Sequence, residues 1–218
     1  MSTAVEQRYE EDFATMPIVA ILRGLVPKEA IAVGTVLVNA GIRILEVPLN
    51  SPEPFESIGL LAKAFGGHAT VGAGTVLRAE DVARVHDVGG QVIISPNCNV
   101  EVIRHTRAAG MISLPGCLTP TEAFAALDAG AHAVKLFPGE LVTPSVAKAM
   151  AAVLPKGTRL LVVGGVSSGT IKDWNGSVVH GFGIGSSLFK PGMTADEVGK
   201  NAEALVGAVR EWAGSSQR

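Results

Sequence analysis

Lys135 is an ionisable residue in a setting where its amine could react with a ketone. It lies in the apolar run 131–138, which is typical of a buried strand. Burial disfavours the charged form of an amine and lowers its pKa, and a neutral lysine amine is a nucleophile that forms Schiff bases with ketones. The alternative is a lysine at a strand end that extends to solvent or pairs with a carboxylate. The segment alone leaves both interpretations open.

Glu46 is a second ionisable residue in an apolar setting. It lies between Leu45 and Val47, where a carboxylate is costly unless it is paired. We expect a general acid–base with a tuned pKa. A buried ion pair with Arg23 or Lys135 is the alternative. The two interpretations overlap, because Arg23 could hold Glu46 in place while both take part in catalysis.

Short apolar runs alternate with helical stretches along the whole chain. Continuous apolar strands are typical of parallel sheets that are covered on both faces. Eight strand–helix units predict an α/β fold, a single-domain (β/α)8 TIM barrel over residues 1–218, and an open doubly wound sheet is the alternative. The expected strands lie near 17–23, 43–49, 69–75, 91–96, 111–115, 133–137, 159–164 and 178–184, and the expected helices near 27–40, 52–65, 79–88, 99–109, 119–129, 144–153, 168–174 and 194–212.

Local signals mark the ends of several of these helices. An N-cap residue followed by proline favours a helix start, and a glycine just after a helix favours a left-handed cap. We expect a polar segment over residues 1–15 and a frayed tail over 213–218. The expected starts are Ser51-Pro52, Thr119-Pro120 and Thr143-Pro144, and the expected caps are Gly41, Gly110 and Gly130.

Composition excludes several classes of protein. The 218 residues are 47% hydrophobic and 17% charged with a net charge of −2, which argues against a nucleic-acid or membrane partner. No apolar run reaches the length of a membrane span, and the acidic N-terminus is not a signal peptide. Two cysteines, Cys98 and Cys117, make no disulfide framework. We therefore expect a cytoplasmic protein. The five histidines lie away from the expected site, so we expect no metal.

Two glycine-rich segments predict a phosphate site. Gly164-Gly165 and Gly183-Ile184-Gly185-Ser186-Ser187 end the last two expected strands. The loops after strands seven and eight of such barrels frequently bind phosphate through backbone N–H groups. The alternative is that these glycines only serve tight turns. A third segment, Gly72-Ala73-Gly74-Thr75, could hold a carboxylate in the same way.

Together these residues resemble the KDPG/KHG aldolase family of class I aldolases. The resemblance runs from about residue 16 to 190. The matching segments are Pro17-Ile18-Val19-Ala20-Ile21-Leu22-Arg23-Gly24, Glu46-Val47-Pro48-Leu49-Asn50-Ser51-Pro52, Gly72-Ala73-Gly74-Thr75-Val76, Ile94-Ser95-Pro96-Asn97, Leu114-Pro115-Gly116-Cys117, Val134-Lys135-Leu136-Phe137-Pro138 and Val163-Gly164-Gly165-Val166.

The resemblance implies a Schiff-base aldolase that acts on a phosphorylated keto-sugar acid without metal or cofactor, usually as a homotrimer. It implies that Lys135 forms the Schiff base, that Glu46 is the acid–base and that Arg23 lies beside Glu46 and the substrate carboxylate. The residues implied to bind substrate are Gly74, Thr75, Pro96, Asn97, Phe137, Val163, Gly164, Gly165, Gly185 and Ser186.

Three positions separate the two epimer types of the family. Gluconate-type members usually have threonine before the paired glycines, arginine or threonine after the glutamate motif, and Pro-Gly after the fourth strand. This chain has Val163, Asn50-Ser51-Pro52 and Pro96-Asn97 there. It resembles the galactonate type, which implies cleavage of 2-dehydro-3-deoxy-6-phospho-D-galactonate to pyruvate and D-glyceraldehyde 3-phosphate. The alternative is a gluconate-type or 4-hydroxy-2-oxoglutarate aldolase.

Two alternative hypotheses use the same site without aldol cleavage. A phosphosugar isomerase or epimerase would use Glu46 as a base and Lys135 only as an electrostatic partner. A phosphosugar sensor would keep the binding site without turnover, although the intact set of Lys135, Glu46 and Arg23 argues against it.

Overall fold

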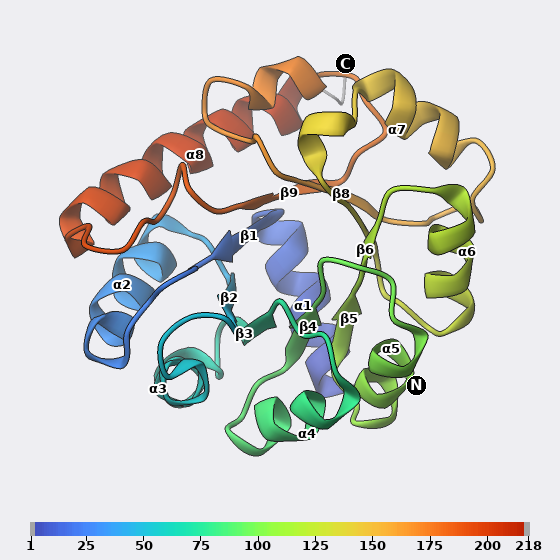
Figure 1. Ribbon diagram of the computed structural model, residues 1–218. Coiled ribbons are helices and arrows are strands. Elements are labelled where there is room, and N and C mark those ends of the chain that lie inside the picture. Colours follow the sequence, from blue (N-terminus) through green and yellow to red (C-terminus); the bar gives the residue numbers. More distant parts are fainter. Residues whose placement is uncertain (1–2, 216–218) are drawn as a thin grey trace.

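Nine short parallel strands form one curled sheet in the computed structural model, which describes residues 3–215 (Figure 1). Their order around the sheet is β5-β4-β3-β2-β1-β9-β8-β7-β6, so neighbours in sequence are neighbours in space. The strands are β1 (Ile18–Ile21), β2 (Ile44–Pro48), β3 (Thr70–Gly74), β4 (Val92–Ile94), β5 (Ile112–Leu114), β6 (Gly116–Cys117), β7 (Val134–Leu136), β8 (Leu160–Val163) and β9 (Gly181–Ile184).

The two ends of this sheet meet at Pro115. Proline has no N–H for the sheet, and Pro115 separates β5, which lies within the strand expected near 111–115, from β6, which lies just beyond it. The carbonyl of Ser113 accepts a hydrogen bond from the His132 N–H at 3.0 Å, and the carbonyl of Pro115 accepts one from the Lys135 N–H at 2.9 Å. These bonds close the ring through eight strand positions, and the predicted single-domain (β/α)8 barrel is confirmed.

The helices lie outside the ring of strands (Figure 1). Within the described residues, no helix is long and apolar enough to span a bilayer. The helices that follow the strands are α2 (Pro27–Ala40), α3 (Pro54–Phe65), α4 (Ala79–Asp87), α5 (Val100–Ala108), α6 (Pro120–Asp128), α7 (Pro144–Ala151) and α8 (Ala195–Ser215), with short 3₁₀ helices η1 (Gly139–Leu141) and η2 (Ile171–Trp174).

Several expected helix ends are confirmed and two expectations are wrong. Thr119 and Thr143 cap α6 and α7 as predicted. The predicted cap at Ser51 is wrong, because α3 begins at Pro54 and the Ser51 hydroxyl instead accepts a hydrogen bond from the Gly24 N–H at 2.9 Å. The helix expected over 168–174 is only the 3₁₀ turn η2.

At the C-terminus we expected a frayed tail over 213–218. The helix α8 continues to Ser215, and residues 216–218 lie outside the described part of the chain.

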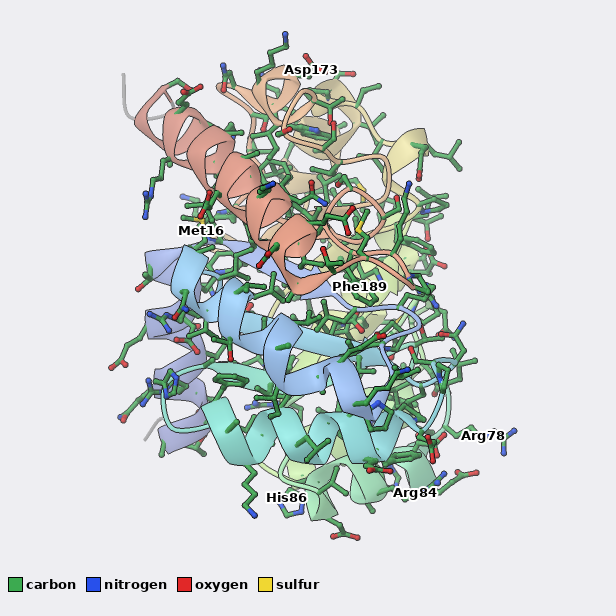
Figure 2. The ribbon with its side chains drawn as sticks, turned by 90° about the vertical axis from the view of Figure 1, so that its left-hand side faces the viewer. Met16, Arg78, Arg84, His86, Asp173 and Phe189 are labelled. Carbon is green, nitrogen blue, oxygen red and sulfur yellow. The ribbon has the colours of Figure 1, made fainter. Side chains whose placement is uncertain are left out.

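An N-terminal helix, α1 (Ala4–Thr15), closes one end of the barrel, where we expected only a polar segment. Thr3 and Glu6 form a capping box that starts it. Its Tyr9 and Phe13 are buried with the interior side chains of the strands. Asp12 accepts a hydrogen bond from the Thr70 hydroxyl at 2.7 Å, at the start of β3. In Figure 2, Met16 marks the side on which α1 leads into β1, and Arg78 marks the opposite end.

Side-chain alternation along the strands decides what faces the barrel interior. Successive residues of a strand point to opposite faces. Ile44 of β2 and Ala133, which precedes β7, belong to the apolar cluster of the interior, whereas Leu45 and Val134 pack in the layer beneath the helices. Two residues further along, Glu46 and Lys135 must therefore face the interior as well. The fold thus places both ionisable groups above an apolar floor.

Truncating the aromatic side chains of α1 tests its role as a plug. Replacing Tyr9 or Phe13 with alanine should lower the free energy of unfolding by about 3–5 kcal/mol, the usual cost of a large core truncation. Urea unfolding at one fixed protein concentration measures this change. Glu11→Ala, an exposed position on the same helix, is the control. A loss no larger than that of Glu11→Ala would contradict the plug.

Candidate active site

A cavity of about 480 Å³ opens at the end of the barrel opposite α1. This is the carboxyl end of the strands, where barrel enzymes build their active sites. Its lining includes both buried ionisable groups. The residues that line it are Ile21, Arg23, Glu46, Thr75, Pro96, Lys135, Phe137, Glu140, Val163, Gly164, Gly165, Val166, Ser167, Gly183, Gly185, Ser186, Ser187, Phe189, Lys190 and Pro191.

Lys135 lies at the base of this cavity with only 7% of its surface exposed. Its Nζ lies 4.7 Å from the centroid of the Phe137 ring. Burial lowers the pKa of the Lys135 amine, the charge of Arg23 lowers it further, and the nearby Glu46 carboxylate opposes both effects. The structure does not carry the side chain out to solvent. Lys135 is therefore a buried amine whose neutral, nucleophilic form is favoured.

Glu46 faces the same cavity and is 2% exposed. Burial raises the pKa of its carboxyl from 4.5 to about 7, although Lys135 and Arg23 pull it down. No cation among the described residues lies within ion-pair distance, and the buried Oε2 atom has no hydrogen-bond partner there. The simple ion pair that the sequence left open is thus absent from the described residues. A carboxyl poised near neutral pH can both give and take a proton.

Two glycines of β3 lie where a side chain would not fit, and one of them, Gly74, makes room for the Glu46 side chain. Gly72 and Gly74 lie opposite Glu46 and Pro48 in the register of β2 and β3. A Cβ on Gly74 would collide with the Glu46 carboxylate, and one on Gly72 would collide with the Val92 carbonyl. Gly74 does not line the cavity itself. It therefore lies behind Glu46, and its missing side chain is what lets the carboxylate occupy this position.

Arg23 follows β1, and its guanidinium donates hydrogen bonds to residues that follow β2 and β3, close enough to Glu46 to lower the pKa of that carboxyl. Its Nη1 donates to Oδ1 of Asn50 at 2.6 Å, and its Nη2 donates to the Thr75 hydroxyl at 3.4 Å. Thr75 has a φ of +56°, in the left-handed region that a β-branched residue rarely adopts. Asn50 entered the sequence argument only as a marker of epimer type. The structure makes it the partner that fixes the guanidinium.

The glycine segments line the same cavity as Arg23 and follow β8 and β9, on the side of β1 away from β2. Gly164 and Gly165 have φ values of +114° and +68°, conformations that favour glycine. Gly185 and Ser186 follow β9, the neighbour of β8. This rim offers backbone N–H groups and little side-chain bulk, so it can accept an anion.

The structure brings most of the predicted site residues together, with two exceptions. Gly74 lies behind Glu46, and Asn97 is exposed and does not line the cavity. The sequence argument also missed residues that do line it, notably Glu140, Ser167 and Lys190. A charged residue shortly after an expected strand, as Glu140 and Lys190 are, was the available signal.

Comparisons with known proteins identify the family of this chain. The family model described as KDPG and KHG aldolase matches residues 9–204. A probable 2-dehydro-3-deoxy-6-phosphogalactonate aldolase of Rhizobium meliloti (strain 1021) is 45% identical over 192 residues, 88% of this chain and 91% of its own. The 2-dehydro-3-deoxy-6-phosphogalactonate aldolase of Escherichia coli (strain K12) is 42% identical over 196 residues, 90% of this chain and 96% of its own.

A solved structure titled "Native KDPGal structure" superposes with a TM-score of 0.89 at 42% identity, covering 91% of this chain and 97% of that one. The KHG/KDPG aldolase of Escherichia coli (strain K12) is more distant, at 29% identity over 167 residues, 76% of this chain and 77% of its own. From the matched family model and these relatives, the chain belongs to the KDPG and KHG aldolase family.

Proposed function

We propose that this enzyme is a Schiff-base aldolase that cleaves 2-dehydro-3-deoxy-6-phospho-D-galactonate to pyruvate and D-glyceraldehyde 3-phosphate. The buried amine of Lys135 at the base of the cavity carries the proposal, because its environment favours the nucleophilic form. Support for the galactonate epimer comes from the two relatives above 40% identity, which carry that name. Val163, whose side chain lines the cavity, also resembles the galactonate type.

In the proposed mechanism Lys135 attacks the C2 ketone and forms a carbinolamine. Glu46 donates a proton as water leaves, and the resulting iminium accepts electrons. Loss of the C4 hydroxyl proton lets the C3–C4 bond break, and its electron pair moves into an enamine. Glyceraldehyde 3-phosphate leaves, protonation of the enamine at C3 restores an iminium, and water then releases pyruvate. The iminium replaces a costly carbanion with a stabilised enamine.

The two charged ends of the substrate have separate places in this proposal. The carboxylate lies near Arg23 and Thr75, whereas the phosphate lies against Gly164, Gly165, Gly185 and Ser186. Pro96 and Phe137 bound the centre of the cavity.

We also propose that the enzyme is a homotrimer, that it is cytoplasmic and that it takes part in galactonate catabolism. Large apolar side chains are exposed around α6, η1 and α7, which neighbour one another on one side of the barrel (Figure 1). Such exposure marks a contact surface in many proteins. The side chains are Leu118, Phe124, Leu141, Val146 and Val153. A phosphorylated sugar acid does not cross a membrane unaided, because its charges cannot be desolvated cheaply, and this favours the cytoplasm.

Borohydride reduction in the presence of pyruvate tests the proposal. We expect a reduced pyruvate adduct, mapped by mass spectrometry to the peptide that contains Lys135. The same protein with borohydride alone is the control. Absence of the adduct would reject the covalent mechanism and favour an isomerase that uses Glu46 as a base. A higher kcat/KM on the gluconate epimer than on the galactonate epimer would reject the epimer assignment but not the aldolase.

A further inference from the structure

The glycine segments at the phosphate end of the cavity carry no full positive charge of their own. The glycine segments supply only the partial positive charges of N–H groups, yet a phosphate monoester is largely a dianion near neutral pH. Among the described residues that line the cavity, the cations are Arg23, Lys135 and Lys190. Lys135 is reserved for the ketone in the proposed function, so Arg23 and Lys190 are the candidates for a phosphate partner.

Arg23 faces away from the phosphate end. It follows β1, and its guanidinium is bonded to Asn50 and Thr75, which follow β2 and β3. The glycine segments follow β8 and β9, which lie on the other side of β1 in the sheet. To reach a phosphate there, Arg23 would have to give up its bond of 2.6 Å to Asn50.

Lys190 is held at the rim by a rigid turn. The N–H groups of Leu188 and Phe189 donate to the Gly185 carbonyl at 2.8 and 2.9 Å, and both side chains are buried. The next residue, Pro191, packs so closely on Gly24 that a Cβ there would collide with it. Figure 2 places Phe189 toward the open end of the barrel, away from α1. The side chain of Lys190 is exposed and forms no ion pair with any described residue.

Glu140 brings a negative charge to the same place. A Cβ on Gly164 would collide with Oε2 of Glu140, and a Cβ on Gly165 would lie 3.2 Å from its Cγ. The carboxylate therefore lies directly beside the two glycines that bind phosphate in the proposed function. A dianion that enters must displace this exposed side chain or be repelled by it. A free cation on the same rim would offset that repulsion.

We propose that Lys190 is the counter-ion of the substrate phosphate and that Glu140 opposes it, so that this pair sets how strongly the enzyme prefers a phosphorylated substrate. The inference rests on the proposed function, because it assigns the charges of the phosphate end of that site. Lys190 binds the phosphate directly. Glu140 acts by repulsion and by occupying the space in front of Gly164.

Two variants test the pair: one removes the positive charge of Lys190, and the other removes the negative charge of Glu140. Lys190→Met should raise KM for the 6-phosphorylated substrate roughly 10–100-fold, as expected for a lost bond to a charged group, and leave kcat nearly unchanged. Its KM for the unphosphorylated sugar acid should not move. Glu140→Gln should lower KM for the phosphorylated substrate alone. High salt should weaken the phosphate preference of the wild type more than that of Lys190→Met.

Matched controls separate this role from a loss of folding or of net charge. Lys200→Met removes the same charge from α8, outside the cavity, and should leave both KM values unchanged. Lys190→Arg should retain most of the preference. An unchanged KM in Lys190→Met, an equal rise for both substrates, or the same effect from Lys200→Met would overturn the proposal.

A binding measurement keeps the inference distinguishable from the proposed function. Pyruvate has no phosphate, so borohydride trapping on Lys135 should be the same in Lys190→Met as in the wild type. Inorganic phosphate should raise the melting temperature of the wild type and raise that of Lys190→Met much less. Equal stabilisation of the two proteins would reject Lys190 as the phosphate partner, even if the sugar acid proved not to be the substrate.

Discussion

Replacing Lys135 with methionine should lower turnover by at least about 10⁴-fold and abolish the borohydride-trapped pyruvate adduct. Lys135 is buried at the base of the cavity, and the proposed chemistry has no other amine there. Methionine is of similar length and apolar, so it suits the buried position and should leave the fold intact. Steady-state cleavage and mass spectrometry measure the two effects, and urea unfolding checks stability.

The companion variant Lys135→Arg separates a nucleophile from an electrostatic partner. Arginine keeps a positive charge but does not form a Schiff base, because its guanidinium stays protonated. We expect this variant to be as inactive as Lys135→Met. Substantial turnover in Lys135→Arg would show that charge alone is sufficient, and it would favour the isomerase reading.

Replacing Glu46 with glutamine should reduce kcat by roughly 10²–10⁴-fold, the range for general acid–base groups. Glutamine fits beside Gly74 in nearly the same volume but cannot exchange a proton. The pyruvate adduct on Lys135 should still form on long incubation, because the amine remains. Retained wild-type turnover would reject the proton-transfer role of Glu46, and loss of both the adduct and the fold would point to a structural role.

The same substitution should change stability in a pH-dependent way. The folded-state pKa of Glu46 is raised to about 7 from an ordinary 4.5. The folded state thus binds this proton more tightly, and stability is lost as pH rises from about 4.5 through 7. Glu46→Gln carries no such loss. At pH 8 we expect it to be more stable than the wild type by roughly 1–3 kcal/mol, after allowance for the lost attraction to Lys135.

Urea unfolding at pH 5 and pH 8 measures this difference. The gap between variant and wild type should be small at pH 5 and largest at pH 8. Glu56→Gln, which removes a carboxylate from α3 outside the cavity, is the control and should show no such trend. A variant that is less stable than the wild type at pH 8 would contradict the burial of an unpaired carboxylate.

The barrel was predictable because the same strand–helix pattern recurs along the chain. Each strand is a short apolar run and each helix has its own boundary residues, such as Thr119 and Thr143, so single errors did not change the topology. The errors arose where tertiary contacts replace local signals. Helix α1 is mostly polar, and only Tyr9, Asp12 and Phe13 are buried, which suffices for a plug but not for a periodic pattern. Pro115 divides a strand only because the ring closes there.

From the sequence alone it follows that Glu46 and Lys135 stand in apolar runs, where an ionisable side chain is costly unless it is paired. The sequence also determined the glycine segments that leave room for an anion. Only the tertiary structure decided how these groups act on one another. Interaction between charges depends on distance and on the water around them, and neither quantity is written in the spacing of residues along the chain.

Two examples make that reason concrete. Arg23 is close enough to Glu46 to lower the pKa of that carboxyl, but only the structure shows that its guanidinium donates to Asn50 and Thr75, which follow β2 and β3. Lys190 and Glu140 are 50 positions apart in sequence and were not expected in the site. β9 and β7 both pair with β8, so the loops that follow them lie near each other and both line the cavity. Loop conformation, which no local pattern fixes, placed both charges there.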